Sequence, residues 1–125
     1  LWLGWKLRVL WQRVKFWFSR KRGAKGERIA ADLLISNGYI LLDTQVALKG
    51  SIKVDGAISS FNTRVDYLVK KEDEQYLVEV KTGVSASPSY IPTRRQLLEY
   101  TRLQGSKKIL LIDASKKTIF CVDFS

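Results

Sequence analysis

The sequence contains no histidine and no methionine, and it has a single cysteine. Without histidine, the usual zinc sites and the nucleophilic systems that pair serine or cysteine with histidine are excluded. Any bound metal must be held by oxygen ligands, which favours magnesium or manganese. The single Cys121 excludes a disulfide within the chain, and we expect it to be buried in a strand. Because the chain starts at Leu1 and lacks methionine, we expect a trimmed start.

Acidic residues are scarce at the start of the chain. The 125 residues carry a net charge of +10, and residues 1–28 contain nine basic residues against one acid, Glu27. The rest of the chain is nearly balanced, with thirteen basic and eleven acidic residues. We therefore expect a polyanion, either phospholipid or nucleic acid, near the N-terminal segment.

Residues 1–22 read as a basic, tryptophan-rich amphipathic helix, with apolar side chains on one face and Arg and Lys opposite. Its four charges within the first 18 residues argue against a bilayer span. No small-residue cleavage site follows, which disfavours a signal peptide. We expect a cytoplasmic protein whose helix lies on the inner face of the membrane. The alternatives are a helix packed on its own domain or on a twin subunit, and a contact with nucleic acid.

Residues 23–125 fit one domain. The patterns predict helices over 25–37, ending at Asn37-Gly38, and over 92–105, starting near Pro92 and closing at Gly105. Strands are expected over 39–48, 51–58, 61–69, 75–83, 107–113 and 118–124, with a break at Lys49-Gly50 between the first two. This order predicts an α/β or α+β domain with a mixed central sheet flanked by helices.

The stretch "RVDYLVKKEDEQYLVEVKTG", residues 64–83, reads as a hairpin with charges set into apolar strands. If its turn is centred on residues 72 and 73, Asp66 and Glu79 are directly opposite each other, with Cβ atoms about 4.5–5.5 Å apart. Alternation puts Lys81 on the same face. Two opposed carboxylates repel each other unless a cation lies between them, and a divalent metal ion would resolve this.

Two carboxylates and a lysine in this arrangement suit phosphodiester hydrolysis. The carboxylates would hold Mg²⁺ or Mn²⁺, which polarises a phosphate oxygen and lowers the pKa of a bound water. The lysine can orient or deprotonate that water, or offset charge on the phosphate. The alternative is a solvated hairpin edge with an ordinary pair of Glu79 and Lys81. Asp55, in "KVDG", is a rival metal ligand, which the following glycine places in a turn or bulge.

The motif "VD", followed thirteen residues later by "EVK", resembles the PD-(D/E)XK nuclease superfamily, with Val65 where a proline often stands. The stretch "KGERIAADLLISNGYILL" looks like the first helix and strand of the Holliday-junction resolvase-like, restriction-endonuclease-like branch, in which Glu27 matches a glutamate that reaches toward the active site. The stretch "RRQLLEY" is similar to the Gln-x-x-x-Tyr element of RecB-type and CRISPR-associated nucleases, on which Gln96 and Tyr100 fall.

The resemblance covers roughly residues 24 to 124. It implies a restriction-endonuclease-like core, dependence on Mg²⁺ or Mn²⁺, and cleavage of DNA, with branched or junction DNA in repair or recombination as a candidate substrate. Asp66 and Glu79 would bind the metal, and Lys81 would act on the water or phosphate.

Further contacts with the nucleic acid are expected from Lys25, Arg94 and Arg95. A homodimer is also expected, because junctions have two-fold symmetry. Two alternatives stay open. One is a non-catalytic nucleic-acid-binding protein on the same fold, and the other is a membrane-surface or scaffold protein that acts through residues 1–22.

Overall fold

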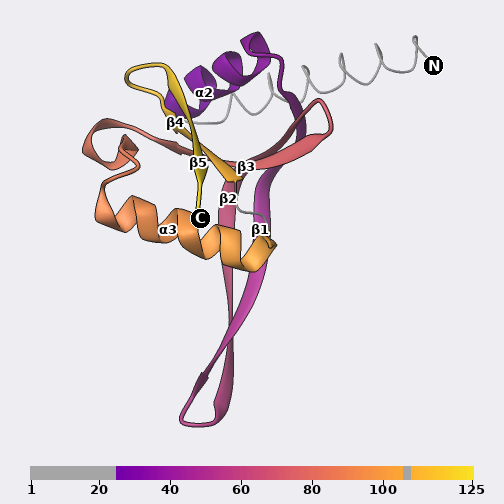
Figure 1. The fold of residues 1–125 in the computed structure, drawn as a ribbon, viewed down its shortest axis with the longest axis vertical. Coiled ribbons are helices and arrows are strands. Elements are labelled where there is room, and N and C mark those ends of the chain that lie inside the picture. Colours follow the sequence, from indigo (N-terminus) through magenta and orange to yellow (C-terminus); the bar gives the residue numbers. More distant parts are fainter. Residues whose placement is uncertain (1–24, 106–107) are drawn as a thin grey trace, which may run out of the picture.

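The computed structural model describes residues 25–105 and 108–125, which form an α+β domain around one five-stranded mixed sheet (Figure 1). The fold class expected from the sequence is therefore confirmed. The elements are α2 (Lys25–Ser36), β1 (Ile40–Val54), β2 (Ala57–Lys71), β3 (Glu74–Lys81), the 3-10 helix η1 (Gly83–Ala86), α3 (Ile91–Gln104), β4 (Lys108–Asp113) and β5 (Thr118–Asp123). The helix expected over residues 1–22 lies outside the described residues.

The five strands lie in chain order across the sheet. The pairs β1–β2, β2–β3 and β4–β5 are antiparallel, whereas β3 and β4 run parallel. A parallel pair needs a crossover, which η1 and α3 supply here. The crossover brings α3 against the sheet, where Leu97 and Tyr100 pack with Leu77 and Leu111. The helix that carries Tyr100 thus covers the β2–β3 hairpin.

Both helices end where the glycine signals predicted. Gly38, with φ of +85°, follows α2, and the amide of Tyr39 donates to the carbonyl of Leu34 at 3.0 Å. Gly105, with φ of +79°, closes α3, and its amide donates to the carbonyl of Thr101 at 2.9 Å. Glycine adopts this left-handed conformation without a steric penalty. No helix within the described ranges is long and apolar enough to cross a membrane.

The break expected at residues 49 and 50 is wrong, because β1 continues through them. Gly50 lies opposite Phe61 on β2. A Cβ at Gly50 would come within 2.5 Å of the Phe61 ring and 2.8 Å of a methyl group of Leu103. The glycine therefore allows the strand, the ring and α3 to pack closely, and it does not mark a turn.

The first turn lies instead at Asp55 and Gly56, which both have positive φ. It joins two strands of 15 residues each into one long hairpin, with Val54 paired to Ala57 at the tip. The turn expected from Gly56 is therefore confirmed. Asp55 is exposed at this tip, whereas β2 pairs with β3 only from Tyr67 onward, so Asp55 is not a rival ligand for the same site.

Each face of the sheet carries a core. The α2-side core contains Ala30, Ala31, Leu34, Leu41, Tyr67, Val69, Val78, Leu110 and Ile112. The α3-side core contains Leu48, Val65, Leu77, Leu97, Tyr100, Ile109 and Leu111. The hairpin charges therefore share their face with a second core, which accounts for their burial.

Cys121 lies in a strand as expected, but the expectation that it is buried is wrong, because its side chain is exposed. Strand β5 is at the edge of the sheet. Alternation turns Ile119 and Cys121 to one face, and Ile119 packs against the α2-side core whereas Cys121 does not belong to it. An edge position is not visible in the local pattern "TIFCVDF".

Candidate active site

The β2–β3 hairpin has the predicted register. Its ladder ends with Tyr67 opposite Val78, and the turn is centred on residues 72 and 73. The same register, carried one residue further, sets Asp66 opposite Glu79 at the point where backbone pairing stops. The two carboxylates therefore meet where β2 begins to separate from β3.

The carboxylate of Asp66 is held by two neighbouring strands. Its Oδ2 accepts a hydrogen bond of 2.8 Å from the main-chain amide of Val80, and it accepts another from the side chain of Gln45 on β1. Burial raises the pKa of Asp66 above its ordinary 3.8, whereas the Val80 amide, the Gln45 side chain and the charge of Lys81 lower it. This carboxyl is partly desolvated, yet its neighbours favour the ionised form.

Glu79 is only 5% exposed. Its Oε2 lies 3.2 Å from Nζ of Lys81. Burial, and after it the negative charge of Asp66, raise the pKa of Glu79 to about 7, although Lys81 and the hydroxyl of Tyr100 act in the opposite direction. Glu79 therefore changes its protonation state near neutral pH, which is common for groups at functional sites.

Gln96 and Tyr100 share a face of α3 and reach the site through the tyrosine hydroxyl. Gln96 Nε2 donates a hydrogen bond of 2.7 Å to Tyr100 Oη. The hydroxyl lies 3.3 Å from Oε1 of Glu79 and 3.2 Å from the main-chain oxygen of Arg64, so its one proton serves one acceptor at a time. Burial and the charge of Glu79 raise the pKa of Tyr100, which keeps it a neutral donor.

Glu27 approaches the site from the first turn of α2. Its main-chain oxygen accepts a hydrogen bond of 3.3 Å from the hydroxyl of Tyr67, which ties the start of α2 to β2. Burial and the negative charge of Asp66 raise the pKa of the Glu27 carboxyl. Glu27 is thus close enough to feel the Asp66 charge, and Lys25 is exposed in the same turn.

The structure does not bring Arg94 and Arg95 to the carboxylates. Both are exposed near the start of α3, and the ion pairs among the described residues include neither. Such side chains are free to meet a phosphate backbone or solvent. Their contact with nucleic acid, like that of Lys25, stays a prediction.

Gln45 is a site residue that the sequence did not reveal. It lies in β1 with φ of +50°, between Thr44, which pairs with Tyr67, and Val46, which pairs with Val65. The side chain of Gln45 donates to the carboxylate of Asp66. Its only signal in the sequence is a polar residue inside the run "LLDTQVAL", which alternation assigns to a solvated face.

The carboxylate pair has the ligand chemistry for one hard divalent ion. Among the residues that the structure describes, no three acidic or cysteine side chains are grouped closely enough to share a metal ion. Magnesium, however, often binds one or two protein carboxylates and completes its shell with water and phosphate oxygens. Burial disfavours the ionised form of both Asp66 and Glu79, and a divalent cation would offset that penalty. The pair therefore fits Mg²⁺ or Mn²⁺.

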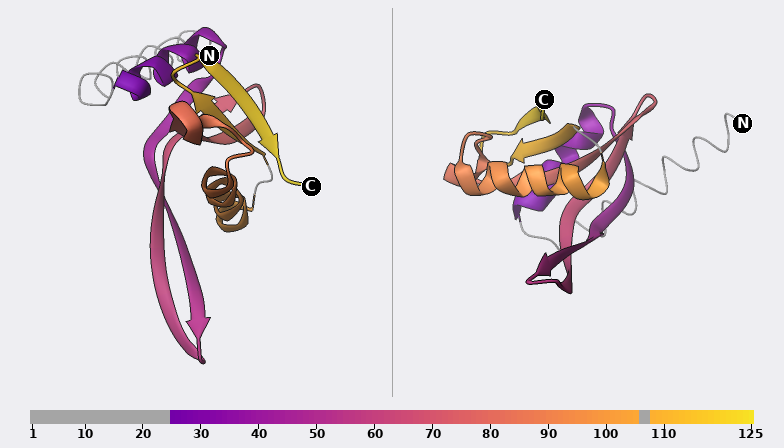
Figure 2. Two further views of the ribbon diagram at one scale, coloured as in Figure 1. Left: turned by 90° about the vertical axis from the view of Figure 1, so that its left-hand side faces the viewer. Right: turned by 60° about the horizontal axis from the view of Figure 1, so that its bottom comes forward.

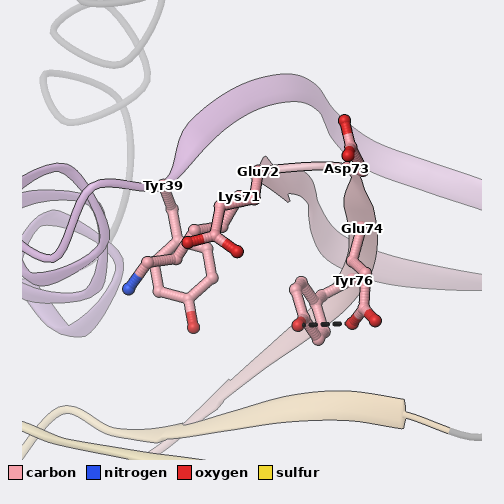
Figure 3. Close-up of a pocket in the computed structure, with 6 residues that line it drawn as sticks. All are labelled: Tyr39, Lys71, Glu72, Asp73, Glu74 and Tyr76. Carbon is pink, nitrogen blue, oxygen red and sulfur yellow. Dashed lines mark hydrogen bonds between the residues drawn. The ribbon is translucent and has the colours of Figure 1, made fainter.

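A separate open pocket of about 570 Å³ lies at the other end of the hairpin (Figure 3). Its lining residues are Tyr39, Lys71, Glu72, Asp73, Glu74 and Tyr76. Nζ of Lys71 lies 4.9 Å from the centroid of the Tyr39 ring, and the hydroxyl of Tyr76 donates a hydrogen bond of 2.7 Å to Glu74. These groups partner each other, and the pocket contains none of the predicted site residues.

No protein-family model and no curated protein matches the chain. The fold is similar to a solved structure described as "Crystal structure of SSO0001", with a TM-score of 0.50 and 19% sequence identity. The match covers 76% of this chain and 46% of that one, so this chain spans less than half the length of that structure. A likeness at this identity shows the fold alone.

Proposed function

We propose that this protein is a nuclease of the PD-(D/E)XK type that hydrolyses phosphodiester bonds in DNA with the help of Mg²⁺ or Mn²⁺. The observation that carries the proposal is the opposed pair Asp66 and Glu79, with Lys81 3.2 Å from Glu79. Charges placed beside an apolar core cost free energy. Two opposed carboxylates also repel each other. A cation-binding role explains why both carboxylates are present here, and a purely structural role does not.

Asp66 and Glu79 would hold the metal ion, which when bound polarises a phosphate oxygen and activates a water molecule. The chain orients both ligands before the ion arrives. Val80 and Gln45 hold Asp66, while the hydroxyl of Tyr100 faces Glu79. Ligands held in this way need little reorganisation, which favours both binding and catalysis.

Lys81 would supply the positive charge next to the reacting phosphate. Its Nζ can orient the attacking water or offset the charge that develops on the phosphate oxygens. Gln96 is a positioning residue, since it acts through Tyr100. The exposed Lys25, Arg94 and Arg95 would contact the phosphate backbone. Branched DNA is the candidate substrate, and a homodimer suits its symmetry.

The proposal also includes a cytoplasmic location, with residues 1–22 on the inner face of the membrane. Nine of the 22 basic residues lie in residues 1–28, and anionic lipid attracts such a segment. Flotation with liposomes, with and without residues 1–22, tests this part separately from cleavage.

A non-catalytic nucleic-acid-binding protein on the same fold is the second candidate. It is favoured by the contacts that already partner both carboxylates, namely the ion pair of Glu79 with Lys81 and the bond from Val80 to Asp66. On this reading the chain binds DNA equally well with or without Lys81 and cuts nothing. A membrane-surface or scaffold protein acting through residues 1–22 is the remaining alternative.

The test is a substrate panel of supercoiled plasmid, linear duplex, single strands and four-way junctions, incubated with Mg²⁺ or Mn²⁺. We expect the wild-type protein to cut at least one substrate and Lys81→Ala to cut none. Asp73→Asn is the matched control, because it removes one exposed acid from the turn of the same hairpin. If DNA is bound but no substrate is cut with either metal, the second candidate holds.

A further inference from the structure

The outer part of the β1–β2 hairpin stands clear of both helices (Figures 1 and 2). The two strands stay paired as far as Val54 and Ala57, whereas β2 pairs with β3 only from Tyr67 onward. All residues from 51 to 60 are exposed. At about 3.3 Å per residue, the hairpin extends roughly 15 Å beyond Gly50, which packs beside α3. We call residues 49–62 the ribbon.

The ribbon is unusual because nothing in the described structure covers residues 51–60. Two-stranded hairpins are marginally stable alone in water. This one also exposes three apolar side chains, with Ile52 54%, Val54 55% and Ile58 68% exposed. A protruding element of this kind is expected to have a binding partner.

The apolar side chains do not form a surface that suits a second copy of the chain. Lys53 lies opposite Ile58, so Ile58 shares a face with lysine, whereas Ile52 and Val54 lie on the other face. Three side chains divided between two faces fall short of the roughly 800 Å² that each partner buries in a stable interface.

One face of the ribbon is basic and rich in hydrogen-bond donors. It carries Lys49, Ser51 and Lys53 from β1 and, opposite them, Asn62, Ser60 and Ile58 from β2. The paired residues of this face include no acid, since Asp55, the one acid of the ribbon, lies in its turn. Neither lysine is ion-paired to another residue within the described ranges. Lysine charges with no acidic partner on an exposed face complement the phosphates of a nucleic acid.

The ribbon also leaves the sheet on the side of the candidate site. Strand β2 departs from β3 at Asp66, and the residues before Asp66 run directly into the ribbon. DNA with a phosphate at Asp66 and Glu79 would therefore extend toward it. The major groove, about 12 Å wide, admits a two-stranded β-ribbon.

We propose that the ribbon docks in a groove of duplex DNA and so holds the duplex for the candidate site. Lys49 and Lys53 contact phosphates, while the apolar side chains near the tip contact sugars and base edges. The inference rests on the proposed function, because it names the partner as the substrate of that site. It adds a binding element that lies outside the carboxylate site.

The test measures binding of a short labelled duplex by fluorescence anisotropy in EDTA, so that no cleavage interferes, over about 50 to 200 mM NaCl. The double variant Lys49→Ala with Lys53→Ala should reduce the slope of log K against log salt by about 1.8, because each phosphate contact contributes about 0.9. The matched control is the double variant Lys70→Ala with Lys108→Ala. It removes one charge near the β2–β3 turn and one at the start of β4, both outside the ribbon. It should keep a slope near the wild-type value.

A ribbon variant with the wild-type slope overturns the proposal, as does an equal loss in the control variant. The rival partner is a second copy of the chain, and the double variant Ile52→Ser with Ile58→Ser tests it by sedimentation. If this variant dissociates a dimer and leaves DNA binding unchanged, the ribbon contacts a second copy and the proposal is overturned. Cleavage is scored separately. If the wild-type protein cuts DNA but the ribbon variant binds DNA with the wild-type salt slope, the ribbon proposal is wrong and the proposed nuclease function stands. If binding depends on the ribbon but no DNA is cut, the nuclease function is wrong and the ribbon proposal stands.

Discussion

The main-chain amide of Val80 donates a hydrogen bond of 2.8 Å to the carboxylate of Asp66. Val80 stands between Glu79 and Lys81, so this bond positions both charged neighbours relative to Asp66. In a regular ladder such an amide donates to a main-chain carbonyl of the facing strand. Here a side chain takes that place, because the β2–β3 ladder has already ended. The candidate site is therefore built where two strands separate.

Glu79→Gln should stabilise the metal-free protein at and above neutral pH. The folded pKa of Glu79 is raised to about 7 from an ordinary 4.5. Between pH 4.5 and about 7 the folded protein keeps a proton on Glu79 that the unfolded chain has lost. The contribution of Glu79 to the free energy of unfolding therefore falls as pH rises through this range, and it is constant above about pH 7. The full effect is at most about 3 kcal/mol. Urea unfolding across this pH range measures it.

The matched control for that measurement is Glu99→Gln, an exposed acid on α3. Glu99→Gln should follow the wild-type pH dependence, whereas Glu79→Gln should be flatter. Equal pH dependence in all three proteins would contradict a desolvated Glu79.

Binding of Mn²⁺ should release protons at mildly acidic pH. A metal ion between the carboxylates favours the ionised form of Glu79, which holds a proton below about pH 7 in the free protein. Calorimetric titration in two buffers of different ionisation enthalpy gives the number of protons released. We expect each bound Mn²⁺ to release a fraction of a proton near neutral pH and a larger fraction at lower pH. The Glu79→Gln variant should release none. Metal binding without proton release would place the ion elsewhere.

The side chain of Gln45 should stabilise the folded protein, whereas its backbone conformation should destabilise it. A left-handed φ of +50° costs a non-glycine residue about 1 kcal/mol or more. Gln45→Ala keeps that strain and loses the hydrogen bond to Asp66, while Gln45→Gly loses both. We expect the glycine variant to be more stable than the alanine variant by about 1 kcal/mol in urea unfolding.

The same two variants also test Gln45 as a positioning residue. The Gln45 side chain lowers the pKa of Asp66, so both variants should shift the acidic limb of the cleavage profile to higher pH. Gln75→Ala, an exposed glutamine on β3, should leave the profile unchanged. An unshifted profile in the Gln45 variants would limit Gln45 to a structural role.

Tyr100→Phe should reduce both stability and cleavage. The hydroxyl is fully buried, accepts from Gln96 and faces Glu79, so its loss leaves two polar groups without this partner. We expect a loss of about 1–3 kcal/mol in unfolding free energy. Because the hydroxyl also lowers the pKa of Glu79, the stability change near pH 7 should move to higher pH. Tyr90→Phe, at the exposed start of α3, is the control. A variant with wild-type stability and titration would show that the contact is incidental.

The hairpin register could be predicted from the sequence because it depends on local chemistry. Alternation and a charged turn suffice to set Asp66 opposite Glu79. The errors came from residues whose role depends on distant parts of the chain. Gly50 looked like a break because Leu103 of α3, which packs against it, lies far along the sequence. Cys121 looked buried because its strand's place at the sheet edge depends on the whole topology.

Gln45 was missed for a related reason. Its contact with Asp66 requires a positive φ inside a strand, and periodicity assumes regular backbone throughout. The structure also places the α3-side core on the face of the hairpin that carries the charges. Leu77 and Val65 lie in that core, so the charges border packed side chains rather than open solvent.

The central claim is that Asp66 and Glu79 together hold one divalent ion. Anomalous diffraction from crystals soaked in Mn²⁺ tests it most directly. We predict a peak between the two carboxylates in the wild-type protein and its loss in Glu79→Gln crystals soaked in the same way. A peak only at the acidic turn of Glu72 and Asp73, or a peak at the site that survives Glu79→Gln unchanged, would contradict it.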